Sequence, residues 1–100
     1  MGKVVNLIGG KWKTVLLYHL LTNKTMRFSE LKKVATGITQ KMLTAQLRSL
    51  EANGLVIRTV YPVVPPKVEY SLSNVGQTLG PILLAMKDWG YEYDKAVVRS

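Results

Sequence analysis

Three prolines within five residues, at positions 62, 65 and 66, separate two segments that favour β-structure. Residues 55–61 are rich in β-branched side chains, and residues 67–72 alternate between polar and apolar side chains. Because proline has no backbone N–H to donate, strand pairing stops at these positions and the stiff segment becomes a loop. The two flanking segments are therefore predicted to pair as a β-hairpin.

Two helices separated by a tight turn are predicted directly before this hairpin. Ser29 is a good N-cap for a short helix that ends before Gly37. Thr39 can cap a second helix, which runs to about Ala52 and is closed by Gly54. An earlier helix of about three turns is predicted from apolar residues at helical spacing, namely Trp12, Val15, Leu16, His19 and Leu20. Helix, turn, helix and hairpin in this order make the arrangement of a winged helix.

The helix after Thr39 has one leucine face and an opposite polar face. At 100° per residue, Leu47 and Leu50 lie within about 40° of Leu43, which makes a narrow apolar stripe. The side chains away from this stripe suit the major groove of DNA, where arginine binds guanine and alanine meets the thymine methyl group. The candidate DNA-binding residues of this helix are Thr39, Gln40, Lys41, Thr44, Ala45 and Arg48. Gln40, Thr44 and Arg48 are the candidates for reading bases. The alternative is an ordinary solvated helix face.

The last third of the chain predicts a helix with a long apolar stripe. Ser73 is a capping residue, and Pro81 is expected to kink this helix or to start it afresh. The stripe consists of Leu79, Ile82, Leu83, Met86, Trp89 and Tyr93. It is long for the core of one small protomer, so a symmetric homodimer is predicted. The alternative is that this helix packs back on Trp12 within the same protomer.

Positive charge is concentrated in the first two-thirds of the chain. The formal net charge is +8; residues 1–67 hold eleven basic and two acidic residues, and residues 68–100 hold three basic and four acidic ones. This distribution favours binding to a polyanion, with solubility alone as the alternative. The candidates for contacts with DNA phosphates are Lys11, Lys13, Lys32, Lys33, Arg58 and Lys67.

The chain contains no cysteine and a single histidine, His19. These counts exclude disulfides, thiol redox switching, cysteine nucleophiles and the familiar zinc sites. No set of residues forms a catalytic constellation, so neither an enzyme nor a bound metal or cofactor is predicted. The longest near-continuous apolar segment, residues 15–21, is far shorter than a membrane-spanning helix, and no leader or lipidation signal is present. A cytoplasmic protein without membrane contact is expected.

Four short blocks follow one another along the chain, at residues 8–12 (IGGKW), 27–31 (RFSEL), 47–56 (LRSLEANGLV) and 65–72 (PPKVEYSL). In this order they resemble the signature blocks of the HxlR-type winged helix-turn-helix transcriptional regulators, a bacterial and archaeal family related to the MarR-like regulators. The resemblance extends over about residues 7–90. Several members of that family sense oxidants or electrophiles through a cysteine near the N-terminus, which this chain lacks.

The resemblance implies a DNA-binding homodimer. It implies a recognition helix over residues 39–53, a wing over residues 56–72, and a dimer interface formed by the N-terminal segment and the C-terminal helix. Together with the apolar stripe, it assigns to this interface Leu7, Trp12, Leu79, Ile82, Leu83, Met86, Trp89 and Tyr93.

The predicted fold class is α+β and mostly helical, a winged helix-turn-helix with a β-hairpin wing and a C-terminal dimerisation helix. Residues 1–100 are expected to form one domain, with the winged-helix core at residues 7–72 and the dimerisation helix at residues 73–100. The predicted function is sequence-specific transcriptional regulation by a homodimer on an inverted-repeat operator in double-stranded DNA. The alternatives are a winged-helix protein-interaction module and a nonspecific nucleic-acid-binding protein.

The sequence leaves open whether the protein responds to a small-molecule effector. Five aromatic residues are candidates for lining an apolar crevice between two protomers, and the alternative is that they form the dimer core. They are Trp12, Tyr18, Trp89, Tyr91 and Tyr93.

Overall fold

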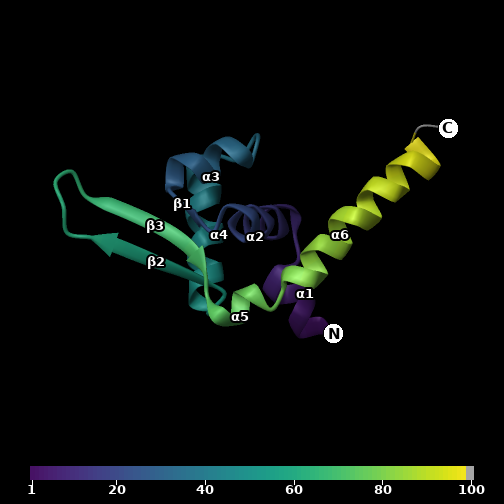
Figure 1. Cartoon of the computed structure of the whole chain (residues 1–100), viewed down its shortest axis with the longest axis horizontal. Helices are drawn as coiled ribbons and strands as arrows, with labels where there is room; N and C mark the ends of the chain where they lie inside the picture. The colour runs from purple at the N-terminus through teal and green to yellow at the C-terminus, as the bar shows by residue number, and fades with distance from the viewer. Residues whose placement is uncertain (99–100) are drawn as a thin grey trace.

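The chain builds a helical body around a small antiparallel sheet, and its last long helix projects away from that body (Figure 1). The computed structural model describes residues 1–98. In chain order the elements are α1 (Gly2–Ile8), α2 (Lys11–Asn23), β1 (Thr25–Met26), α3 (Phe28–Val34), α4 (Gln40–Ala52), β2 (Val56–Tyr61), β3 (Lys67–Leu72), α5 (Asn74–Gln77), α6 (Gly80–Tyr93) and a π-helical turn, Asp94–Val98. The mostly helical α+β class and the winged helix-turn-helix architecture are confirmed.

The predicted hairpin is present, with its prolines in the loop between the strands. β2 and β3 pair antiparallel, from Val56 opposite Leu72 to Tyr61 opposite Lys67. A third strand, β1, pairs with the other edge of β3 and gives the strand order β1-β3-β2. The sequence pattern does not predict β1, because a strand of two residues carries no periodicity of its own.

The core is formed by leucines that α2, α3 and α4 turn toward one another. The most completely buried side chains are Leu16, Leu17, Leu20, Leu31, Leu43 and Leu50. Each buried leucine stabilises the fold by about 1.5–3 kcal/mol relative to an exposed one. One apolar core therefore fixes the three helices, and the remaining faces of α3 and α4 are left to solvent.

The turn between α3 and α4 follows the sequence prediction except at the start of α3. The Thr39 hydroxyl oxygen accepts a hydrogen bond from the Met42 N–H at 3.1 Å, as an N-cap does, and Gly37 has a φ of +93° in the turn. The prediction that Ser29 caps α3 is wrong: the cap is Arg27, and α3 begins at Phe28. The Glu30 carboxylate accepts a hydrogen bond from the Arg27 N–H at 2.8 Å, which fixes the helix start two residues earlier.

The C-terminal part forms two helices in place of one continuous helix. The Ser73 hydroxyl oxygen accepts a hydrogen bond from the Gly76 N–H at 2.9 Å and caps the short α5, as predicted. α6 then starts afresh, with Pro81 in its first turn, where a missing N–H costs nothing. α6 extends beyond the rest of the molecule (Figure 1). The whole molecule measures 53 × 27 × 22 Å along its principal axes.

The N-terminal helix α1 is not predicted by the sequence pattern. Of its seven residues only Ile8 is buried, so it shows little of the apolar periodicity that reveals an amphipathic helix. Val4 and Val5 are exposed on it. No helix within residues 1–98 combines the length and the apolar character needed to cross a membrane.

Candidate nucleic-acid interface

The polar face of α4 is directed to solvent. Gln40, Lys41, Ala45 and Arg48 are exposed, whereas Leu43, Leu47 and Leu50 on the opposite face are buried. Thr44 is half-buried, and its hydroxyl donates a hydrogen bond to the Gln40 carbonyl oxygen at 2.9 Å, which leaves the hydroxyl oxygen able to accept. The buried stripe thus determines which side chains α4 presents outward.

Beside this face, α4, the wing and the first residue of α3 line a polar pocket of about 250 Å³. Its lining residues are Phe28, Thr44, Leu47, Arg48, Glu51, Arg58 and Tyr70. Arg48 comes from α4 and Arg58 from β2, so the fold brings one predicted base-reading residue and one predicted phosphate-binding residue to the same pocket. Burial is the main cause that raises the pKa of Tyr70, so its hydroxyl remains a neutral donor.

An acidic residue in this pocket was missed by the sequence reasoning. The Glu51 carboxylate lies 3.7 Å from the Arg58 Nε. Both side chains are partly exposed, so solvent weakens the ion pair, but the pair still links the last turn of α4 to the wing. No local pattern predicts it, because it depends on how α4 and β2 pack.

Lys67 is less available than predicted, because it is paired within the wing. Its Nζ lies 3.3 Å from the Glu69 carboxylate and 5.1 Å from the centre of the Tyr61 ring. A hydrogen bond between the Tyr61 hydroxyl and Glu69 lowers the pKa of that carboxyl and raises the pKa of Tyr61. The charge of Lys67 is therefore partly neutralised by its own strand.

The remaining candidate cations lie on α2 and α3. Lys32 and Lys33 are exposed in α3, the first helix of the helix-turn-helix. Lys13 donates a hydrogen bond to the Asn6 carbonyl oxygen at 3.4 Å, and the Lys11 Nζ lies 4.7 Å from the centre of the Trp12 ring. These contacts place Lys11 and Lys13 at the junction of α1 and α2.

The predicted dimer residues divide into two groups. Leu83 is only 3% exposed and belongs to the core of the protomer, and three others are partly buried against that core, namely Leu7, Trp12 and Leu79. The other four are exposed on α6: Ile82, Met86, Trp89 and Tyr93. The first group packs largely inside the protomer, whereas the second gives α6 an apolar face that is exposed to solvent within residues 1–98.

The five aromatic residues that are candidates for a crevice between two protomers, or for the dimer core, do not form one cluster within a single protomer. Trp12 packs on the core, while Trp89 and Tyr93 stack on α6 with 5.3 Å between ring centres. Tyr18 makes an edge contact with His19, and both line a separate pocket of about 320 Å³ between α2 and α6. Among residues 1–98, no group of three acidic or histidine side chains is placed to hold a metal ion.

The chain forms a helix-turn-helix whose second helix has an exposed polar face, and a β-hairpin follows it in the sequence. This arrangement defines a winged helix-turn-helix protein. The chain belongs to the HxlR-like helix-turn-helix family, whose model matches residues 7–97. Its relatives are HTH-type transcriptional regulators, and this protein is a transcriptional regulator and not an enzyme.

Close relatives are found in Bacillus subtilis. The chain is 57% identical over 89 residues to YdeP, an uncharacterized HTH-type transcriptional regulator; the match covers 89% of this chain and 69% of YdeP. It is 54% identical over 96 residues to YybR, another such regulator, with 96% of this chain and 75% of YybR covered. Among solved structures, the reduced form of the redox regulator HypR superposes with a TM-score of 0.91 at 48% identity, covering 99% of this chain and 97% of that one.

Proposed function

We propose that this protein is a sequence-specific DNA-binding regulator that acts as a homodimer on an inverted-repeat operator. The observation that carries the proposal is the exposed polar face of α4. Gln40, Thr44 and Arg48 stand on a helix held by three buried leucines, and this helix is the second of the helix-turn-helix. In that architecture the second helix enters the major groove.

Cationic residues beside α4 position the protein on the DNA backbone. Lys32 and Lys33 on α3 are the leading candidates for phosphate contacts, because both are exposed on the first helix of the helix-turn-helix. Arg58 on β2 is a further candidate, and a phosphate there would compete with its ion pair to Glu51. Lys41 on α4 lies within the same surface. The wing, with its proline-containing tip, is expected to lie along the flanking backbone or minor groove.

The dimer part of the proposal rests on the apolar face of α6. Burying the exposed Ile82, Met86, Trp89 and Tyr93 against a second copy removes them from water, and a two-fold axis pairs the same face of both copies. Two recognition helices then reach half-sites about one helical turn apart, roughly 34–36 Å centre to centre. Residues 7–72 would serve as the DNA-binding part and residues 73–100 as the dimerisation part, in the cytoplasm where the operator lies.

Any response to a small molecule is proposed to be independent of cysteine. HypR is described as a redox regulator, but thiol oxidation has no substrate among the 100 residues of this chain, since none of them is cysteine.

The proposal is tested by binding to the DNA upstream of the protein's own coding region, measured by gel shift with random duplex as competitor. A regulator is expected to prefer one segment by about a thousandfold or more over random DNA. A footprint of that segment should show two protected half-sites related by inverted symmetry. Equal binding to all duplexes would indicate a nonspecific nucleic-acid-binding protein, and no salt-dependent binding would indicate a protein-interaction module; either result overturns the proposal.

A further inference from the structure

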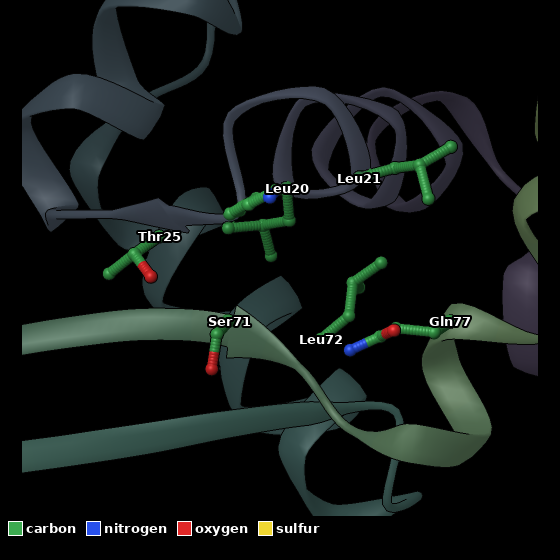
Figure 2. Close-up of a pocket in the computed structure, with 7 residues that line it drawn as sticks. Leu20, Leu21, Thr25, Ser71, Leu72 and Gln77 are labelled. Atoms are coloured by element: carbon green, nitrogen blue, oxygen red, sulfur yellow. The ribbon is translucent and has the colours of Figure 1, made fainter.

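A cavity lies where α2, β1, β3 and α5 meet, and the candidate DNA-binding residues do not line it (Figure 2). Its volume is about 420 Å³, within the range of roughly 300–1,000 Å³ that is usual for small-molecule sites. The residues that line it are Leu20, Leu21, Lys24, Thr25, Ser71, Leu72 and Gln77.

The lining combines an apolar floor with a polar rim that carries one positive charge. Leu20 and Leu72 are almost fully buried, and Figure 2 shows Leu72 pointing toward α2 with the Gln77 side chain reaching toward it. Lys24 is the only charged residue of the seven, and Thr25, Ser71 and Gln77 add uncharged hydrogen-bonding groups. The rim therefore favours an anion, and the floor favours an apolar group attached to it.

The rim groups are free to turn toward a ligand. Within residues 1–98, the side chains of Lys24, Thr25, Ser71 and Gln77 make no hydrogen bond or ion pair with other protein groups. Lys24 has a φ of +66°, which ends α2 and turns the chain at once into β1. This turn sets the lysine and Thr25 together at the mouth of the cavity.

The cavity walls are connected to both functional helices. Leu21, in the wall, lies 3.4 Å from the position that a Cβ on Gly80 would occupy, so it touches the first residue of α6. Gln77 belongs to α5, which is held to the end of α4: the Ser73 hydroxyl donates a hydrogen bond to the Gly54 carbonyl oxygen at 2.6 Å. A molecule in the cavity would contact α5 directly through Gln77 and would reach the start of α6 through Leu21.

We propose that this cavity binds a small organic carboxylate and that its occupation changes the direction of α6 relative to α4. The apolar part of the ligand lies between Leu20 and Leu72, and its carboxylate accepts hydrogen bonds from the Lys24 ammonium and from the rim groups. The effect on α6 and α4 rests on the proposed function, because it requires that α6 dimerises and that α4 reads DNA. The binding itself does not depend on that function.

Binding is tested with the full chain, labelled with ¹⁵N, against carboxylates and their neutral amides: benzoate with benzamide, phenylacetate with phenylacetamide, and hexanoate with hexanamide. At least one carboxylate is expected to shift the amide signals of Thr25, Ser71 and Gln77, and its amide to bind about ten- to hundredfold more weakly, as the loss of a charge-assisted hydrogen bond implies. Equal binding of acid and amide, or binding of none of the three acids, overturns the proposal.

Substitutions at the exposed rim locate the site. Lys24→Gln should weaken carboxylate binding about tenfold or more, and Lys24→Arg should retain most of it, because the arginine keeps the charge. Lys3→Gln is the matched control, since it removes an exposed lysine on α1 and should leave binding unchanged. Signal shifts confined to Tyr18, His19 and Leu83 would place the ligand in the pocket between α2 and α6 and overturn the assignment.

The coupling is tested separately by measuring operator affinity with and without the bound carboxylate. Wild type should change its affinity at least about threefold at saturation, and Lys24→Gln should show no change at the same concentration. Carboxylate binding without an effect on operator affinity would overturn the coupling alone. Failure to find an operator would overturn the proposed function and leave the binding result standing.

Discussion

At the scale of single residues, Arg48 and Arg58 are the most informative, because they approach the same pocket from α4 and from the wing. Arg48 is exposed on the polar face of α4, whereas the Arg58 Nε lies 3.7 Å from the Glu51 carboxylate. The two arginines are therefore expected to have different tasks. Under the proposed function, we expect Arg48 to read a base and Arg58 to contact a phosphate.

Arg48→Ala is expected to weaken operator binding by about 1–3 kcal/mol and to weaken random DNA much less, because a base contact is lost. Lys33→Ala, which removes an exposed lysine on α3, is the comparison: it should weaken both DNAs alike and reduce the salt slope by about 1 per protomer, or about 2 for the dimer. Fluorescence anisotropy on both duplexes measures the two losses. An equal loss on operator and random DNA for Arg48→Ala would contradict its role in base reading.

The Glu69 carboxylate gives a pH-dependent prediction for the wing. Its pKa lies below the ordinary value of 4.5, because the Tyr61 hydroxyl hydrogen-bonds to the charged form and Lys67 attracts it. A lowered pKa means that the interaction is complete above pH 4.5 and is lost as the pH falls through the depressed value. An NMR titration of the Glu69 carboxyl carbon should show its midpoint below 4.5, and Tyr61→Phe should move the midpoint upward. A midpoint at or above 4.5 in the wild type would contradict the hydrogen-bonded arrangement.

The same pairing predicts an effect on DNA binding at neutral pH. Glu69→Gln removes a negative charge next to Lys67 and should strengthen binding to operator and random DNA alike, by about two- to tenfold at low salt. The gain should shrink as salt is added, because it is electrostatic. Gel shifts at two salt concentrations measure it; a gain restricted to the operator would contradict this reasoning.

At the scale of elements, the sequence predicts best what depends on local contacts. α4 follows from its cap at Thr39 and its three leucines, and the hairpin follows from the prolines between two β-prone segments. In contrast, β1 exists only through its pairing with β3, and α1 buries a single residue. The sequence pattern places the start of α3 at Ser29, because serine is a common N-cap residue. In the structure the N-cap is Arg27, whose N–H donates a hydrogen bond to the Glu30 carboxylate.

In the candidate site, too, local contacts determine some features and packing between elements determines others. The outward face of α4 could be predicted, because the buried stripe fixes the opposite side. The pairing of Arg58 with Glu51 could not, because it arises where α4 and β2 meet in the folded chain. The burial of Leu83 in the protomer core also depends on packing between α2 and α6, and periodicity alone does not separate a core face from a partner face.

α5 is held against the end of α4 so closely that one of its residues has to be glycine. A Cβ on Gly76 would lie 2.2 Å from the Leu55 carbonyl oxygen, which is backbone and cannot turn away. Gly76→Ala should therefore lower the free energy of unfolding by about 1–3 kcal/mol, as overpacking does. Gly2→Ala, where a Cβ meets nothing within 4 Å, should not lower it. Urea unfolding of both variants measures the difference, and a fully stable Gly76→Ala would contradict the close packing of α5.

At the scale of the whole molecule, the compact winged helix and the projecting α6 divide the surface into two parts of different character (Figure 1). The basic residues that flank α4 belong to the winged helix, and the exposed apolar residues of α6 lie on the projecting part. The excess of positive charge thus lies on the winged helix, whereas residues 68–100 hold three basic and four acidic residues. Under the proposed function, the winged helix binds the polyanion and α6 associates with a second copy.

Trp89→Glu tests this division, because Trp89 is 68% exposed on the apolar face of α6. A charge there should prevent dimerisation, since it would be buried without a partner in the interface. Tyr91→Glu makes a comparable change at a residue that is 65% exposed and lies outside the apolar stripe, and it should leave the dimer intact. Analytical ultracentrifugation measures the mass of both variants.

Loss of the dimer should also change how DNA binding depends on salt. If a dimer neutralises about eight phosphates, the logarithm of the affinity falls with the logarithm of salt at a slope of roughly −7. A monomeric Trp89→Glu protein contacts one half-site and should show about half that slope, together with a much weaker affinity for the full operator. The monomeric variant should still bind a single half-site at low salt, because its α4 and its wing are unchanged. A monomer that kept the full slope would show that one copy makes all the phosphate contacts, and the assignment of α6 to dimerisation on DNA would have to be abandoned.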